Sequence, residues 1–89
     1  MRRIAQRKQF RQDIKRQKRR GKDIDDLIAA VEMLAETGVL PVAYQPHRLS
    51  GEWKGTWECH IDADWLLIYA VSATEVLLIR TGSHSDLFG

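Results

Sequence analysis

Three histidines, all in the second half of the chain, are the side chains best suited to acid–base chemistry near neutral pH. His47, His60 and His84 each lie near a glycine turn, an aromatic residue or a cation. The unperturbed pKa of histidine is about 6.5, so its ring gains or loses a proton close to neutrality. These residues either contribute to one phosphodiester-cleaving centre or are unrelated surface residues.

Cleavage of RNA without a metal needs few protein groups, because RNA supplies its own nucleophile, the ribose 2′-OH. The protein must remove the proton of that hydroxyl, protonate the leaving 5′ oxygen and stabilise charge on the phosphorane. Besides the histidines, Asp64 suits proton transfer, and Arg80 and Lys54 supply fixed positive charge. The same residue types are equally compatible with a structural or binding role.

Other kinds of catalytic centre find less support in the sequence. The spacing of the three histidines matches no compact metal-binding motif, and the HExxH, CxxC and Asp-rich loop patterns are absent. Ser83 and Ser85 lie in a predicted loop without a nucleophile elbow, which disfavours a Ser/His/Asp triad. Gly51, Gly55 and Gly82 are isolated and do not form a phosphate-binding loop. We therefore expect no metal or other cofactor.

The charge of this 89-residue chain is distributed very unevenly. Residues 1–22 contain eleven Lys and Arg and a single acid, Asp13, whereas the remainder is net acidic. A basic block of this density is typical of proteins with a phosphate-rich partner, although a solvated helix surface has the same composition.

The remaining composition favours one small cytoplasmic domain. A single cysteine, Cys59, excludes an internal disulfide and suggests a reducing compartment. The longest apolar run, Trp65 to Val71, is far shorter than the roughly 20 residues that span a bilayer. No apolar run of signal-peptide length follows the basic N-terminus, so we expect no membrane association.

The periodicity of the first half predicts a short strand over residues 1–5 followed by two helices. Residues 7–20 are rich in good helix formers, with only a thin apolar stripe. Asp23 is a plausible N-cap for the second helix, which Gly38 and Pro41 should end. Its apolar residues follow the i, i+3, i+4, i+7 spacing of an amphipathic helix.

The period changes to two after a loop over residues 38–52. Residues 53–61 alternate apolar and polar side chains and predict a half-buried strand with Lys54 and His60 on its polar face. Residues 65–71 and 76–79 are continuously apolar and predict an antiparallel hairpin covered on both faces. The fold expected is α+β in the order β-α-α-β-β-β, with a small, mostly antiparallel sheet packed against an N-terminal αα-hairpin.

The C-terminal half resembles the YafQ-type toxins of the RelE/ParE superfamily. The resemblance rests on Leu-Ser-Gly at 49–51, Trp-Lys-Gly at 53–55, His-Ile at 60–61, Asp-Trp-Leu-Leu-Ile-Tyr at 64–69 and Arg-Thr-Gly-Ser-His-Ser-Asp-Leu-Phe at 80–88. The predicted element order also fits that superfamily, so the resemblance covers essentially the whole chain as a single domain over residues 1–89, with a RelE-like microbial ribonuclease fold.

The resemblance implies a toxin of a type II toxin–antitoxin system that enters the ribosomal A site and cuts mRNA without metal. It implies a cognate protein antitoxin and a ribosome as partners. The matching family residues imply that four residues share proton transfer and the orientation of the reacting groups: His47, His60, Asp64 and His84. The phosphate or RNA contacts are Arg80, Lys54, Trp65 and Phe88. Ribosomal RNA contacts are expected on the basic helix, from Arg11, Lys15, Arg16, Lys18, Arg19 and Arg20.

Two other interpretations stay open at this point. One is a ParE-like toxin that inhibits a topoisomerase by binding and needs no acid–base histidines. The other is a non-catalytic RNA- or ribosome-binding module on the same fold. The sequence departs from the family pattern at two positions. Trp57 stands where a basic residue is expected, and Ala63 stands where proline is common. The loss of a basic residue at Trp57 is compatible with the non-catalytic alternative.

Overall fold

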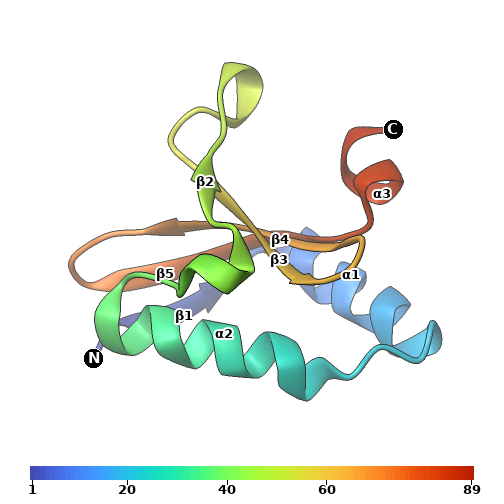
Figure 1. Ribbon diagram of the computed structural model, residues 1–89, viewed down its shortest axis with the longest axis horizontal. Coiled ribbons are helices and arrows are strands. Elements are labelled where there is room, and N and C mark those ends of the chain that lie inside the picture. The colour runs from blue at the N-terminus through green and yellow to red at the C-terminus, as the bar shows by residue number, and fades with distance from the viewer.

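A computed structural model describes all residues, 1–89, as one mixed sheet flanked by helices (Figure 1). The strands are β1 (Arg3–Gln6), β2 (His47–Arg48), β3 (Trp57–Asp62), β4 (Trp65–Val71) and β5 (Glu75–Gly82). The α-helices are α1 (Lys8–Arg19), α2 (Ile24–Thr37) and α3 (His84–Phe88), and two short 3-10 helices are η1 (Val42–Tyr44) and η2 (Gly51–Trp53).

The five strands are arranged in the order β1-β5-β4-β3-β2, and only the β1–β5 pair is parallel. In the view of Figure 1, α2 lies below the sheet, whereas α3 and the loop that contains η2 lie above it. The predicted α+β class, the β-α-α-β-β-β order of the main elements and the mostly antiparallel sheet are confirmed. The structure adds two elements that were predicted as loops, the edge strand β2 and the short helix α3.

Strand β4 is buried on both faces, which explains its continuous apolar sequence. Trp65, Leu67 and Tyr69 pack in the main core with residues of α1 and α2. Leu66 and Ile68 point to the other face and pack with Leu87 of α3. The smaller of these two clusters lies beneath the helix that carries His84.

The two long helices begin and end close to their predicted limits. The side chain of Asp23 accepts a hydrogen bond from the backbone N–H of Asp25 and so caps α2. Gly38 follows α2 with φ of 79°, a left-handed conformation that glycine adopts without a steric penalty. No helix of the chain is both long and apolar enough to cross a bilayer.

The predicted strand over residues 53–61 is wrong at its N-terminal end, because β3 begins only at Trp57. Gly51 and Gly55 have φ of 66° and 92°, and these left-handed conformations interrupt the extended backbone. Between them η2 forms, and Thr56 donates hydrogen bonds to the carbonyl of Trp53. Alternating polarity over residues 53–56 therefore belongs to a tight loop, and Lys54 lies in that loop and not on a strand.

Candidate active site

The strand register places several of the expected site residues in one row across the sheet. His47 of β2 is opposite Glu58 of β3, Glu58 is opposite Ile68 of β4, and Ile68 is opposite Arg80 of β5. Directly opposed residues share a face of the sheet. Since Ile68 packs beneath α3, the row lies on the α3 face.

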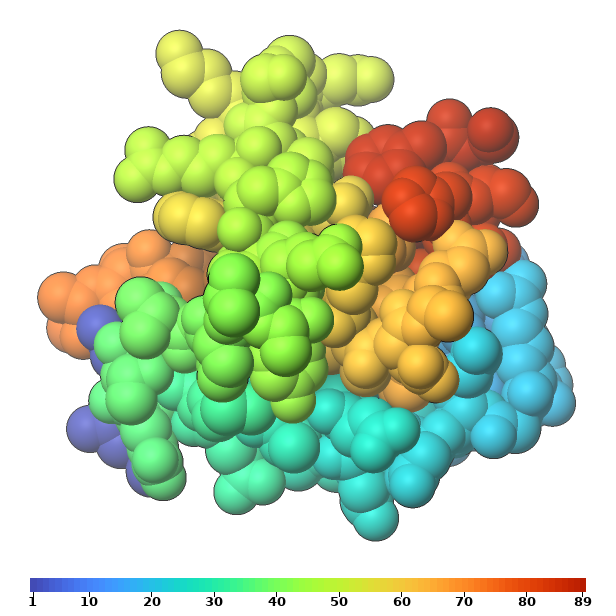
Figure 2. All heavy atoms as spheres, in the orientation of Figure 1, coloured from blue at the N-terminus to red at the C-terminus, as the bar shows by residue number.

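A neighbouring row leads from the sheet into α3. His60 is opposite Leu66, which is opposite Gly82, and His84 follows two residues later at the start of α3. Figure 2 shows the C-terminal segment and the β2–η2 segment rising on two sides of the β3–β4 region. The expected proton-transfer residues therefore gather on one face of the molecule.

The shortest contact among these residues joins His84 to Asp64. Asp64 Oδ1 accepts hydrogen bonds from the backbone N–H of His84 at 2.9 Å and from its ring Nδ1 at 2.7 Å. An ionised carboxylate can only accept, so Nδ1 carries the proton and Nε2 points away from Asp64. These hydrogen bonds from His84 hold the pKa of Asp64 below its usual range. Asp64 sits in the β3–β4 turn at φ of 46°, a conformation that Asp tolerates better than most residues.

Two aromatic rings lie next to the His84–Asp64 pair. The ring of His60 lies edge-on to that of His84, with centroids 6.0 Å apart. Phe88, one turn further along α3, lies 6.5 Å from His84 and makes an edge contact with Trp53 at 6.2 Å. Phe88 is nearly half exposed, so one side of its ring is open to a ligand.

His47 is held by a residue that the sequence analysis did not single out. Its Nε2 lies 3.3 Å from Oε1 of the buried Glu58, and its Nδ1 lies 3.1 Å from the carbonyl oxygen of Gln45. Both ring nitrogens thus face oxygen acceptors, which fixes the orientation of the ring. The alternating pattern of β3 already placed Glu58 on the same polar face as His60, and this was the sequence feature that could have indicated its role.

Arg80 has a carboxylate partner within the protein. Asp13 of α1, only 2% exposed, accepts from Nε of Arg80 at 2.7 Å and from Nη2 at 3.2 Å. Hydrogen bonds with Asp13 raise the pKa of Arg80, so this cation stays fully charged. Asp13 was visible in the sequence only as the single acid of the basic block.

Trp65 was expected to contact RNA, and the structure shows that this expectation is wrong. Its side chain is 1% exposed, and its indole N–H donates to Oγ1 of Thr81 at 2.9 Å inside the core. A buried ring with its polar group satisfied has no face on which a base could stack.

Trp57, which replaces the basic residue expected from the family pattern, lies on the face of the sheet opposite α3. Trp57 is opposite Tyr69, which packs in the main core, so it lies on the face of α1 and α2. Arg48, its cross-strand neighbour, stacks over the indole at 5.3 Å. Trp57 therefore removes nothing from the face that carries the histidines. Lys54 is exposed beside this region, in a depression that also includes Arg48 and Trp57.

The six cations expected to contact ribosomal RNA fall into different environments. Arg20 and Arg16 both form ion pairs with Asp86 of α3. Asp86 also accepts from the N–H of Ser83 and completes the capping box of α3. Arg16 and Arg20 therefore tie the end of α1 to the helix that bears His84, a role that the sequence alone did not predict.

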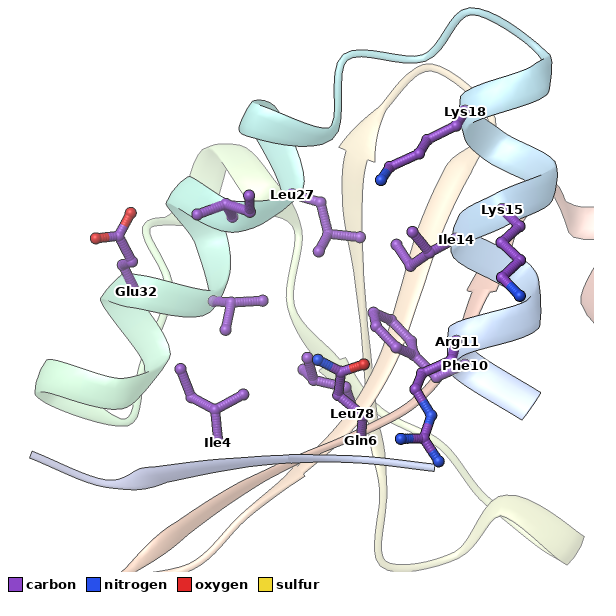
Figure 3. Close-up of a pocket in the computed structure, with 12 residues that line it drawn as sticks. Ile4, Gln6, Phe10, Arg11, Ile14, Lys15, Lys18, Leu27, Glu32 and Leu78 are labelled. Atoms are coloured by element: carbon purple, nitrogen blue, oxygen red, sulfur yellow. The ribbon is translucent and has the colours of Figure 1, made fainter. Parts of the chain in front are cut away.

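Three others border a groove between β1, α1 and α2. Figure 3 shows Arg11, Lys15 and Lys18 along α1, beside a floor of aliphatic and aromatic side chains that includes Phe10 and Leu27. These cations thus border a partly apolar surface. The sixth cation, Arg19, is exposed.

Two further features bear on the chemistry. Nowhere do three or more His, Cys, Asp or Glu side chains come together as a possible metal site. Burial raises the pKa of the Cys59 thiol to about 12, so it is a buried core residue and not an activated nucleophile.

Comparison with known proteins extends over the whole chain. The family model for YafQ, the bacterial toxin of type II toxin–antitoxin systems, matches residues 2–89. The mRNA interferase toxin YafQ of Escherichia coli K12 is 37% identical over 82 residues, covering 91% of this chain and 89% of that protein.

Solved structures agree with the sequence comparison. YafQ from E. coli BL21(DE3) has a TM-score of 0.93 at 34% identity, with 100% of both chains covered. YafQ in the E. coli DinJ–YafQ complex has a TM-score of 0.91 at 36% identity, again with 100% of both chains covered. The chain therefore belongs to the YafQ family of toxins from bacterial type II toxin–antitoxin systems.

Proposed function

We propose that this protein is a ribosome-dependent endoribonuclease that cuts mRNA in the A site, with the ribose 2′-OH as nucleophile and no metal. The observation that carries the proposal is the 2.7 Å hydrogen bond between Asp64 and Nδ1 of His84, with the ring of His60 beside it. A curated relative that covers nearly the whole chain is named an mRNA interferase.

Proton transfer is assigned to His84 and His60. With Nδ1 bound to Asp64, His84 presents Nε2 to the substrate, and Asp64 holds the ring in that orientation. His60 supplies the second titrating group, so that one ring removes the 2′-OH proton and the other protonates the 5′ oxygen.

Charge stabilisation is assigned to the row on the sheet. Arg80 contacts the scissile phosphate. His47 lies in the same row of the sheet and orients the substrate there. Lys54, in the depression beside Arg48 and Trp57, contacts the RNA backbone away from the scissile phosphate. The exposed part of the Phe88 ring stacks on a base of the mRNA.

The proposed partners follow from the family and from the charge distribution. A cognate antitoxin protein neutralises the toxin, as the DinJ–YafQ complexes of E. coli suggest by analogy. The α1 cations Arg11, Lys15, Lys18 and Arg19 contact ribosomal RNA phosphates in the cytoplasm.

The first test is expression in growing cells with and without the gene of the antitoxin. We expect growth arrest in its absence, with new mRNA 5′ ends at codon positions. Purified protein should cut ribosome-bound mRNA much faster than naked mRNA. Because ribosomes need Mg²⁺, the toxin is treated with a chelator and desalted before it is added, and its rate should not change.

Other outcomes would identify the alternatives. Growth arrest with intact mRNA and damaged DNA would favour a topoisomerase inhibitor. Ribosome binding without new mRNA ends would favour a non-catalytic module. Loss of cleavage after chelation, with recovery on adding a divalent transition metal, would contradict the metal-free mechanism.

A further inference from the structure

We propose that Asp13 of α1 is a positioning residue for this reaction, which holds the guanidinium of Arg80 so that its remaining nitrogen faces the scissile phosphate. The inference rests on the proposed function, in which Arg80 contacts that phosphate. It assigns a role in the reaction to the only acid of the basic N-terminal block.

Asp13 is the centre of a buried polar cluster. Its carboxylate, 2% exposed, accepts from Nε and Nη2 of Arg80, from the backbone N–H of Thr81 at 3.1 Å and from the side chain of Gln9 at 3.3 Å. A buried carboxylate is tolerated when its oxygens are satisfied in this way. Four contacts fix its position more firmly than a surface ion pair would.

The contact with Thr81 follows from the way the sheet ends. The β1–β5 pairing stops at Gln6 and Leu78, so β1 offers no partner to the later residues of β5. The N–H of Thr81 donates to Asp13 in place of a strand partner. Asp13 therefore joins α1 to the part of β5 that carries Arg80.

The backbone at Arg80 is displaced by a β-bulge. Ile68 is opposite Arg80 but Tyr69 is opposite Leu78, which leaves Ile79 as the extra residue. Bulges re-aim side chains and occur often beside active sites. Here the bulge brings Arg80 to the α3 face, in the row with Glu58 and His47.

The geometry of the guanidinium determines which nitrogen of Arg80 is not bound by Asp13. Nε and Nη2 are both bound to one carboxylate, which fixes the plane of the group. No protein acceptor takes the hydrogens of Nη1, and the Arg80 side chain is 22% exposed. The free nitrogen is thus held in one direction before the substrate arrives, which is how positioning accelerates a reaction.

The test measures Asp13→Asn, Arg80→Lys and the double variant, each in single-turnover cleavage at saturating ribosomes, together with the ribosome dissociation constant. We expect Asp13→Asn to lower the saturated rate about tenfold to a hundredfold with little change in affinity. The double variant should be no slower than Arg80→Lys alone, because Asp13 acts through Arg80. Asp25→Asn, an exposed acid of α2, is the matched control.

Two results would overturn the inference: a wild-type saturated rate in folded Asp13→Asn, or additive losses in the double variant. If Asp13→Asn fails to fold, Arg80→Ala replaces it. Millimolar guanidinium should then restore part of the rate of Arg80→Ala, whereas methylammonium should not, and equal or absent rescue would contradict the role of Asp13. If the wild-type protein itself shows no cleavage, the proposed function fails first and the inference fails with it.

Discussion

At the scale of single residues, carboxylates hold the basic side chains of the candidate site. Asp64 orients His84, Glu58 faces His47, and Asp13 binds Arg80. A lone cation or imidazole on a small sheet would sample many rotamers. Each carboxylate reduces that freedom, so in the proposed reaction these side chains would bind substrate with less loss of conformational entropy.

The proton-transfer assignment predicts large losses from single histidine substitutions. His60→Ala and His84→Ala should each lower the single-turnover cleavage rate by at least about 100-fold, the usual scale for a general acid or base. Both side chains lie outside the two core clusters, so the variants should keep the circular dichroism spectrum of the wild type.

Asp62→Asn is the control for this pair, because Asp62 is an exposed acid on the same hairpin with no hydrogen bond or ion pair to either histidine. It should cleave at close to the wild-type rate. Wild-type rates in both histidine variants would show that neither ring transfers a proton in the rate-limiting step.

At the scale of elements, α3 has only five residues and needs support from outside itself. Leu87 anchors it to the sheet, while Asp86 caps its first turn and binds Arg20 and Arg16 of α1. A Cβ added at Gly82 would lie 2.8 Å from Oδ2 of Asp86, so glycine is required where this carboxylate approaches the backbone. The position of His84 thus depends on α1, which lies far away in the sequence.

The Asp86 contacts predict a pH-dependent contribution to stability. Hydrogen bonds from Arg20 hold the pKa of Asp86 well below its usual range. A carboxyl with a depressed pKa in the folded state stabilises the fold above its unfolded pKa, about 3.9, and this stabilisation is lost as the pH falls towards the folded value. The difference in unfolding free energy between the wild type and Asp86→Asn should be constant above about pH 5 and shrink below pH 4.

Urea unfolding at several pH values between about 3 and 7 measures this difference. Asp25→Asn serves again as the control, because its exposed carboxyl has no cationic partner within the protein. A difference that is the same at pH 3 and pH 7 would show that the ion pairs with Arg20 and Arg16 do not stabilise the folded state.

At the scale of the whole molecule, the cations of the basic block fall into two groups. Arg16 and Arg20 form exposed ion pairs with Asp86 of α3. Others, including Arg11, Lys15 and Lys18, have no acidic partner in the protein and border the groove on the other side of α1. This second group has no internal acid to compete with an external polyanion, whereas Arg16 and Arg20 are exposed but already paired with Asp86.

This division predicts different effects of charge reversal. The triple variant Arg11→Glu, Lys15→Glu, Lys18→Glu should weaken ribosome binding and lower the slope of log K against log salt by roughly one for each lost phosphate contact. Its cleavage rate at saturating ribosomes should stay near the wild-type value. The matched double variant Arg16→Glu, Arg20→Glu should instead lower the saturated rate by about tenfold or more, because α3 loses its attachment.

The measurements are the ribosome dissociation constant over a salt series and the single-turnover rate. An unchanged affinity and salt slope in the triple variant would mean that these cations form only a solvated surface. A lost saturated rate in the triple variant would mean that they take part in the chemistry.

The sequence by itself determined the two long helices, the central strands and a set of candidate site residues. Amphipathic spacing predicted α2, its caps predicted its ends, and continuous apolar runs predicted β4 and β5. These patterns are local, so they can be interpreted without knowing the fold. The resemblance in the C-terminal half proposed His60, Asp64, His84 and Phe88 as site residues, and the structure places them close together.

Only the tertiary structure decided which residues are free to act. Trp65 matches the family motif but is buried, and Arg80 is bound to Asp13, 67 residues earlier in the chain. Arg16 and Arg20 resemble the other cations of α1 but meet Asp86 of α3. Burial and ion pairing join residues that are distant in sequence, and they depend on strand register, on the β5 bulge and on the packing of α1 against the sheet. No local pattern encodes those three features.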